Sequence, residues 1–334
     1  MKALVLERPN DPFRLVDVPT PTPRPGEVLV RIHASGVNPL DTKIRAGAAA
    51  HARHPFPAIL GVDLAGVVEA PGDGVTAFRR GDEVYGMTGG VGGVPGSLAE
   101  FAAVDARLLA RKPANLSMPQ AAALPLAAIS AWEGLVDRAR VSSGSSVLVQ
   151  GGAGGVGHIA VQLALALGAQ VHATVSPRNF DEIARLGATP IDRTLPAGEQ
   201  VKRHANGEGF DVVFDTVGGT VLDASFEAVR RFGHVVSILG WGTHPLGPLS
   251  FKGGTYSGVF TLLPLLSGVG REHHGEILVR IAALAEEGKL SPRLDPRRFA
   301  LADAETAHAA VASGAAAGKI VIGVVDEADP PLRR

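Results

Sequence analysis

Three glycines at a fixed spacing follow an apolar run near the middle of the chain. Residues 147–171 read VLVQGGAGGVGHIAVQLALALGAQV, in which Gly152, Gly154 and Gly157 match the pattern G-x-G-x-x-G. The run at 145–150 predicts a strand, and 156–168 predicts a helix that ends at Gly168. Glycines at such a junction tighten the turn and let backbone N–H groups at the positive end of the helix dipole approach a phosphate. We therefore predict a dinucleotide-binding loop, completed by Gly155 and Val156.

The end of the next predicted strand indicates which dinucleotide binds. A fold that prefers NAD places Asp or Glu about 20 residues past the loop, where the carboxylate binds the ribose 2′-hydroxyl. Here that position falls on Ser176, which is followed by Arg178, and Asp181 comes later. A 2′-phosphate is bound well by a hydroxyl and a guanidinium, and a carboxylate repels it. The sequence therefore predicts NADPH as the cofactor. Arg193 is a second candidate for this pocket; the alternative for both arginines is an ordinary exposed position.

Strand and helix patterns alternate around the glycine loop. Residues 209–218 predict a strand, 220–233 a helix and 234–240 a strand ending at Gly240, a further candidate for cofactor binding. Repeated βα units of this kind imply a parallel sheet with right-handed crossovers and helices on both faces.

The two ends of the chain have a different texture. Short β-rich runs separated by Gly and Pro fill the first 115 residues or so, and this pattern returns from about Ser291. We predict an α/β protein in which a β-rich domain (1–117 and 291–334) carries an inserted, doubly wound parallel-sheet domain (118–290).

Composition excludes several classes of function. The 334 residues carry a formal net charge of −1, which does not favour nucleic acid as a partner. The chain has no cysteine, so disulfides, thiolate zinc sites and thiol nucleophiles are excluded. No uncharged apolar stretch of 18 residues occurs, and the first residues do not resemble a signal peptide. We expect a cytoplasmic protein that does not interact with membranes.

Several motifs, in a fixed order, resemble those of the medium-chain dehydrogenase/reductase superfamily. They include GVNPLDTKIRAG, LGVDLAGVVEAPGDGV, GDEVYG and AAALPLAAISAWEGL, followed by the glycine loop. The chain is most similar to the zinc-free quinone oxidoreductase (zeta-crystallin-like) branch. This resemblance implies a GroES-like catalytic domain, a Rossmann domain, an active-site cleft between them and usually a homodimer or tetramer, of which we expect the homodimer.

The resemblance also implies that no metal takes part. Zinc-dependent members carry a catalytic cysteine and a Gly-His-Glu motif; these positions fall here on Asn38 and on Gly61-Val62-Asp63. Without a metal to stabilise an alkoxide, the acceptor must be electrophilic itself. Quinones and α,β-unsaturated carbonyl compounds meet this condition, because hydride addition gives a delocalised phenolate or enolate.

Three side chains are candidates for the catalytic site. The resemblance places Asn38 beside the nicotinamide and substrate, where it would orient a carbonyl or carboxamide, and Ser130 in the nicotinamide pocket. Trp241 follows the strand that ends at Gly240 and could stack on an acceptor. The alternatives are a turn asparagine before Pro39, a helix serine bonded to its own turn, and an aromatic ring packed in a loop.

Two other acidic residues are expected to have structural roles. Asp41 and Arg45 are spaced for an ion pair one helical turn apart, and Asp63 is expected to be structural as well.

The sequence leaves three functions open. The first is reduction of quinones or enones by NADPH. The second is reduction of an enoyl thioester, which uses the same fold and cofactor. The third is a nucleotide-binding structural or stress protein with little turnover.

Overall fold

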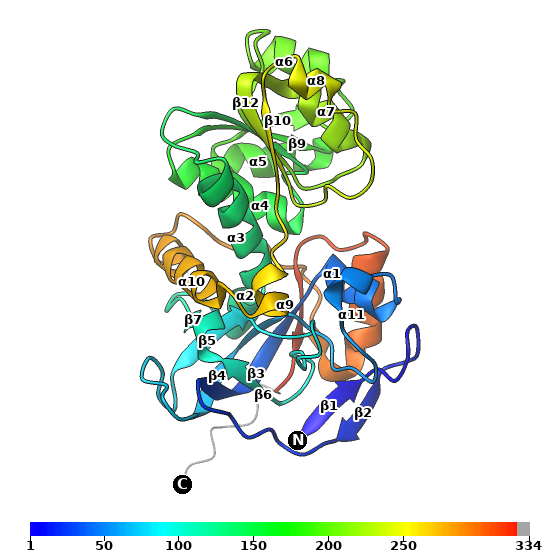
Figure 1. Cartoon of the computed structure of the whole chain (residues 1–334), viewed down its shortest axis with the longest axis vertical. Helices are drawn as coiled ribbons and strands as arrows, with labels where there is room; N and C mark the ends of the chain where they lie inside the picture. The colour runs from blue at the N-terminus through cyan, green and yellow to red at the C-terminus, as the bar shows by residue number, and fades with distance from the viewer. Residues whose placement is uncertain (326–334) are drawn as a thin grey trace. The chain divides into compact units, whose positions relative to one another are not determined.

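The computed structural model describes residues 1–325. These residues form two compact units, one made of Met1–Leu126 and the chain from Leu262 onward, the other of Ala127–Thr261. Figure 1 shows the elements of each unit.

The Ala127–Thr261 unit is built on a six-stranded, entirely parallel sheet. Its strands are β8 (Ser146–Gln150), β9 (Gln170–Val175), β10 (Thr189–Asp192), β11 (Phe210–Asp215), β12 (Val229–Ser237) and β13 (Thr255–Gly258). The spatial order of the strands is β10-β9-β8-β11-β12-β13. The chain adds strands outward from β8 to β10, then returns to the other side of β8 and adds β11, β12 and β13 in the opposite direction across the sheet. This is the order of a doubly wound dinucleotide-binding sheet, and it confirms the predicted fold class.

Helices connect these strands. They are α3 (Pro125–Trp132), a π-helix η3 (Glu133–Arg138), α4 (Gly155–Ala166), η4 (Pro177–Asn179), α5 (Phe180–Leu186), α6 (Ala197–His204), α7 (Thr220–Ala228) and α8 (Gly247–Ser250). Part of the core lies between the sheet and α7, where Leu222 and Phe226 pack with Leu148 and Val213.

The helix predicted over 220–233 is too long. It ends at Ala228, and β12 begins at Val229. The helix end is capped by a residue distant in sequence. Lys252 Nζ donates to the carbonyl oxygen of Val229 at 2.7 Å and to that of Glu227. These carbonyls would otherwise need partners at the helix end.

The other unit contains a seven-stranded sheet and a separate two-stranded one. The strands are β1 (Lys2–Val5), β2 (Arg14–Asp17), β3 (Glu27–Val37), β4 (Asp63–Pro71), β5 (Glu83–Met87), β6 (Phe101–Asp105), β7 (Leu109–Arg111), β14 (Phe299–Ala300) and β15 (Ile320–Gly323). The large sheet runs β14-β15-β3-β4-β5-β7, with β6 also paired to β3. Antiparallel pairing of β15 with β3 joins the two ends of the chain in one sheet.

Short helices surround this sheet. They are α1 (Pro39–Arg45), η1 (Ala50–Ala52), η2 (Ala106–Leu108), α2 (Met118–Ala122), α9 (Leu263–Ser267), α10 (Arg271–Glu286), η5 (Leu301–Asp303) and α11 (Ala304–Ala312). The last of these lies where the sequence analysis expects mainly β-structure.

The division between the units differs from the predicted ranges, because α2 and α10 pack within the β-rich unit. Tyr85 Oη donates to the Leu278 carbonyl at 2.6 Å, and Arg271 pairs with Asp105 at 3.0 Å. The main chain of α10 also approaches η2 closely, since a Cβ on Gly275 would lie 2.4 Å from the Arg107 oxygen. Residues 118–126 and 262–290, which the sequence analysis places in the inserted domain, therefore contact the β-rich unit.

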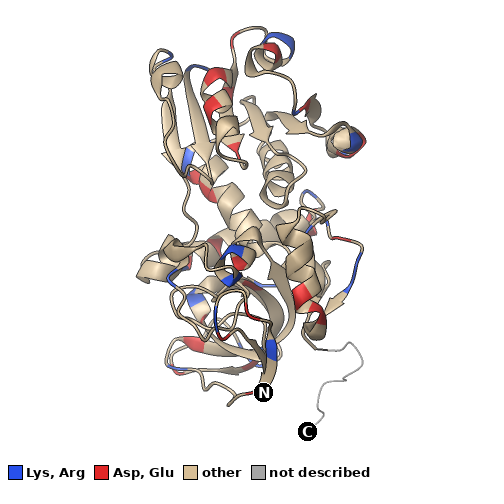
Figure 2. Cartoon of the chain, turned by 90° about the vertical axis from the view of Figure 1, so that its right-hand side faces the viewer, with Lys and Arg blue, Asp and Glu red and all other residues tan. Residues whose placement is uncertain are grey.

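Positions of both charge signs are interspersed along the ribbon of each unit (Figure 2). Among residues 1–325, none of the helices combines the length and the apolar character that crossing a membrane requires.

Candidate active site

The glycine loop lies between β8 and α4, as predicted. A Cβ on Gly157 would lie 2.1 Å from the Gly151 oxygen, and a Cβ on Gly152 would lie 2.6 Å from the Ala173 Cβ on β9. These two glycines therefore allow α4 and β9 to approach the loop closely. Gly155, by contrast, has no neighbouring atom within 4 Å of its Cβ position, so its outer side is open.

The start of α4 is suited to an anion. Its N-cap is Gly154, which has no side chain to accept a hydrogen bond from the N–H groups of Gly155, Val156 and Gly157 in the first turn. The loop before it is held by Thr174, whose Oγ1 accepts from the Gly151 N–H at 3.1 Å and donates to Gln150 at 2.7 Å. The cradle therefore fits the pyrophosphate of a nicotinamide dinucleotide.

The residues predicted to bind the 2′-phosphate lie at the carboxyl ends of β9 and β10. Ser176 directly follows β9, and Arg178 is exposed within η4. Arg193 directly follows β10 and is exposed, and its backbone N–H donates to the Val175 oxygen at 3.0 Å. The structure thus brings the backbone of Arg193 next to the end of β9, as the prediction requires.

A buried carboxylate organises the loops that follow β11 and β12. Asp215 accepts from the N–H groups of Val217 and Gly218 at 3.0 Å, and from Ser237 Oγ at 2.7 Å. Gly240 and Trp241 lie in the second of these loops. A Cβ on Gly240 would lie 2.0 Å from Tyr256 Oη, which gives this glycine a packing role in addition to the predicted binding role.

Trp241 is half exposed and packs edge-on against Phe260, with ring centroids 5.9 Å apart. Its carbonyl oxygen also lies 3.2 Å from Nε2 of His244, whose Nδ1 is 2.8 Å from Asp223. The hydrogen bond to Asp223 raises the pKa of His244. In the structure, Trp241 is therefore an aromatic ring packed within a loop, which is the alternative given in the sequence analysis. Its stacking on an acceptor remains a prediction.

Ser130 is buried in α3 and does not bond its own helical turn. Its Oγ lies 2.9 Å from Thr261 Oγ1, which donates to Glu133 at 3.2 Å. Glu133 begins the π-helix, where the ring of Phe214 occupies the space that a Cβ on Gly134 would need. Such helix irregularities are common at functional sites.

Asn38 belongs to the β-rich unit, where it lies in a buried polar cluster. Its Nδ2 donates to Asp63 Oδ2 at 2.9 Å, and its Oδ1 accepts from Lys319 Nζ. Lys319 Nζ also lies 3.3 Å from Asp63 Oδ2. The Asn38 N–H donates to Asp41 Oδ2 at 2.8 Å, which anchors the start of α1. We refer to Asn38, Asp41, Asp63 and Lys319 as the Asn38 cluster.

The predicted Asp41–Arg45 ion pair is wrong. Arg45 instead pairs with Glu305 at the start of α11, and its guanidinium lies over the ring of Phe13. The Asp41 carboxylate lies within the Asn38 cluster, and burial raises its pKa to about 7. Burial also raises the pKa of Asp63, against the opposing effects of Lys319 and Asn38.

The residues of the Asn38 cluster do not fit a zinc ion. Where zinc-dependent members have thiolate and imidazole ligands, this chain has the amide of Asn38 and the isopropyl group of Val62. A lysine ammonium additionally bonds to Asn38 and Asp63 and would repel a divalent cation.

Comparisons with known proteins agree with this architecture. Residues 24–114 match the alcohol dehydrogenase GroES-like domain, and residues 186–322 match the zinc-binding dehydrogenase family. The chain is 37% identical over 314 residues to 2-methylene-furan-3-one reductase of Solanum lycopersicum, covering 92% of this chain and 74% of that protein. It belongs to the medium-chain dehydrogenase/reductase superfamily.

Two further members of the superfamily are similar over nearly the whole chain. The NADPH-dependent alkenal/one oxidoreductase of Arabidopsis thaliana is 34% identical, over 92% of this chain and 74% of that protein. A crystal structure of an alcohol dehydrogenase superfamily protein from Novosphingobium aromaticivorans is 58% identical, with a TM-score of 0.96, over 97% of this chain and 100% of that one.

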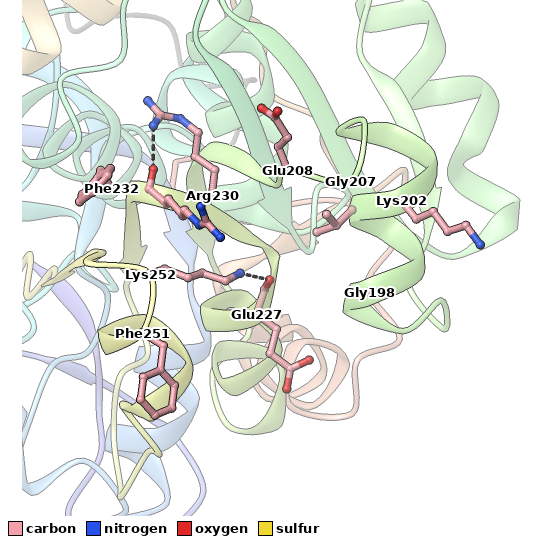
Figure 3. A pocket seen from close by; sticks show the side chains of 11 residues that line it. Gly198, Lys202, Gly207, Glu208, Glu227, Arg230, Phe232, Phe251 and Lys252 are labelled. Carbon is pink, nitrogen blue, oxygen red and sulfur yellow. Dashed lines mark hydrogen bonds between the residues drawn. The ribbon is translucent and has the colours of Figure 1, made fainter.

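A hollow of about 910 Å³ lies elsewhere in the Ala127–Thr261 unit of this dehydrogenase/reductase. Its lining comes from α6, the residues just before β11, the end of α7, the start of β12 and the residues that follow α8, so it lies toward the amino ends of the strands (Figure 3). Ligands of doubly wound sheets bind at the opposite, carboxyl ends. Two of its cations are already engaged, Arg230 with Asp211 and Lys252 with main-chain oxygens. The hollow is therefore at the wrong end of the sheet for a dinucleotide, and the glycine loop remains the predicted site.

Sequence reasoning did not find three polar residues of the site. Asp215 and Thr261 lie within apolar segments without a motif around them, and their partners are distant in sequence. For Lys319 the sequence does contain a signal, a lysine directly before the apolar residues Ile320–Ile322 of a strand.

Proposed function

We propose that this protein reduces α,β-unsaturated carbonyl compounds and quinones with NADPH. The proposal depends on the presence, in one chain, of two features: a dinucleotide cradle at β8–α4 and a cluster around Asn38 that does not suit zinc. The similarity to an alkenal/one oxidoreductase and a methylene-furanone reductase supports the same class of acceptor.

The roles of the residues follow from their chemistry. The N–H groups at the start of α4 would bind the pyrophosphate, and Ser176, Arg178 and Arg193 would bind the 2′-phosphate. Bound NADPH supplies the hydride. Asn38 would donate a hydrogen bond to a carbonyl oxygen of the substrate or of the carboxamide. Ser130 would line the nicotinamide pocket, and Trp241 would contact the acceptor.

The test is NADPH consumption with 1,4-benzoquinone, an alkyl enone and crotonyl-CoA, measured side by side. Turnover of the first two acceptors would support the proposal. A preference for crotonyl-CoA would identify an enoyl-thioester reductase instead. No NADPH oxidation with any of them would favour a binding protein without turnover.

Replacing Arg178 with alanine is expected to weaken NADPH binding roughly tenfold, the value of one charge-assisted hydrogen bond, and to leave NADH binding nearly unchanged. Arg178 is exposed and is not part of the fold's core, so the variant should fold normally. Isothermal titration with both nucleotides measures the effect. Arg185→Ala on α5 is a matched control. Equal weakening of NADH would show that the arginine does not read the 2′-phosphate.

We also propose that the protein is a cytoplasmic homodimer that pairs along β13. This strand is the last in its sheet and is bonded only to β12 among the described strands. The large side chain of Phe251, which precedes it, is 92% exposed. Light scattering coupled to size-exclusion chromatography gives the mass in solution, and a monomer would contradict the proposal.

A further inference from the structure

The amide of Asn38 lies between two opposite charges. Its oxygen accepts from the Lys319 ammonium, and its nitrogen donates to the Asp63 carboxylate. The side chains of Asp63 and Lys319 are 0% and 9% exposed, respectively. Both charges therefore act on the amide in a region where water screens them little.

This arrangement allows one orientation of the amide. If the amide were rotated by half a turn, its NH2 group would face the ammonium and its oxygen would face the carboxylate. Both hydrogen bonds would be lost and replaced by repulsion, at the cost of one hydrogen bond from each of two buried charged groups. The amide nitrogen carries two hydrogens and donates one to Asp63, so the second N–H is the one that would serve a ligand under the role proposed for Asn38.

Both charged residues are themselves fixed. The other oxygen of Asp63 accepts from the Leu126 N–H at 2.9 Å. Lys319 is held by its main chain, because its N–H donates to the Arg293 oxygen at 2.7 Å and its oxygen accepts from the Asp295 N–H at 3.0 Å. The two charges thus hold the amide from rigid positions rather than from mobile loops.

We propose that Lys319 is a positioning residue: together with Asp63 it fixes the amide of Asn38 so that Asn38 presents an N–H donor to a carbonyl oxygen. Its ammonium bonds to Asn38, which stands at the position of the catalytic cysteine of zinc-dependent members, and to Asp63, and it supplies positive charge there. This inference rests on the role proposed above for Asn38.

The test compares steady-state kinetics and thermal stability of five variants with NADPH and an alkyl enone. They are Asn38→Ala, Lys319→Met, Asn38→Ala/Lys319→Met, Lys319→Met/Asp63→Asn and the exposed-lysine control Lys289→Met. Removing a donor that stabilises developing charge typically costs about 100-fold or more in kcat, so we expect a loss of that order for Asn38→Ala and at least roughly tenfold for Lys319→Met. The control should match the wild type.

Two of the variants separate positioning from stability. In Lys319→Met/Asp63→Asn both charges are gone, so we expect the melting temperature lost in Lys319→Met to recover while kcat stays low, because no charge then fixes the orientation of the amide. In the Asn38→Ala background, Lys319→Met should lower kcat no further, since it acts through the missing amide.

The outcomes are distinguishable. Two outcomes would overturn the positioning role alone. One is recovery of both kcat and the melting temperature in Lys319→Met/Asp63→Asn. The other is that Lys319→Met lowers kcat as much in the Asn38→Ala background as in the wild type. Full activity of Asn38→Ala would overturn the role of Asn38, and with it this inference. Absence of enone reduction by the wild type would overturn the proposed function itself.

Discussion

Replacing Asp41 with asparagine is expected to raise the free energy of unfolding above pH 7 by roughly 4 kcal/mol, at about 1.4 kcal/mol for each unit of pKa shift. The Asp41 side chain is 1% exposed, and burial raises its pKa from 3.8 to about 7. Nearby Asp63 raises it further, while the Asn38 N–H and the Lys319 ammonium act in the opposite direction. Asparagine keeps the acceptor for the Asn38 N–H without the cost of a buried charge.

The sign of the pH dependence follows from these pKa values. Below about pH 4, Asp41 is protonated in both the folded and the unfolded chain. Between about pH 4 and 7 the unfolded chain releases the proton and the folded chain keeps it, so stability falls as the pH rises. Above about 7 the folded carboxyl also ionises and the loss is complete.

Urea unfolding of the wild type and of Asp41→Asn from pH 4 to 8 measures this difference. In Asp41→Asn, the free energy of unfolding should not show the fall between about pH 4 and 7 that Asp41 causes in the wild type. The control Asp73→Asn, at an exposed residue, should show the same pH dependence as the wild type. Parallel stability curves for Asp41→Asn and the wild type would contradict the burial argument.

Replacing Gly157 with alanine is expected to lower the free energy of unfolding by about 3 kcal/mol, the upper range for overpacking, and to abolish measurable binding of NADPH. The new methyl group would lie 2.1 Å from the Gly151 oxygen and 3.0 Å from the Gly152 Cα. Both are backbone atoms of the loop, which must move for α4 to accommodate the side chain.

Gly198→Ala is the matched control, because this glycine is also helical but has no atom within 4 Å of its Cβ position. That variant should be as stable as the wild type or slightly more stable. Thermal unfolding with and without NADPH measures both effects. Unchanged stability of Gly157→Ala would show that the close approach of α4 to the loop is not required.

The Ala127–Thr261 unit was largely predictable because its signals are local. The glycine spacing, the apolar strand before it and the periodic helix after it lie within 25 residues. The helix over 220–233 was overextended because its end depends on Lys252, which is distant in sequence and carries no helix-ending signal of its own.

The Asn38 cluster was only partly predictable for the same reason. Asn38 and Asp63 were singled out through the family resemblance, whereas Lys319 is separated from them by more than 250 residues. The assignment of Arg45 to Asp41 failed because the one-turn spacing says nothing about Glu305, which reaches the guanidinium from α11. Local rules cannot reveal partners that only the completed sheet brings together.

The pairing of β15 with β3 has a consequence for the order in which the chain matures on the ribosome. Val37 pairs with Ile320, so this part of the sheet cannot form until residue 320 has left the ribosome, whereas the segment 127–261 is complete earlier. Lys319 directly precedes β15, so its ammonium reaches Asn38 and Asp63 at the same stage. Until then, the two buried carboxyl groups of the Asn38 cluster lack the counter-charge of this lysine.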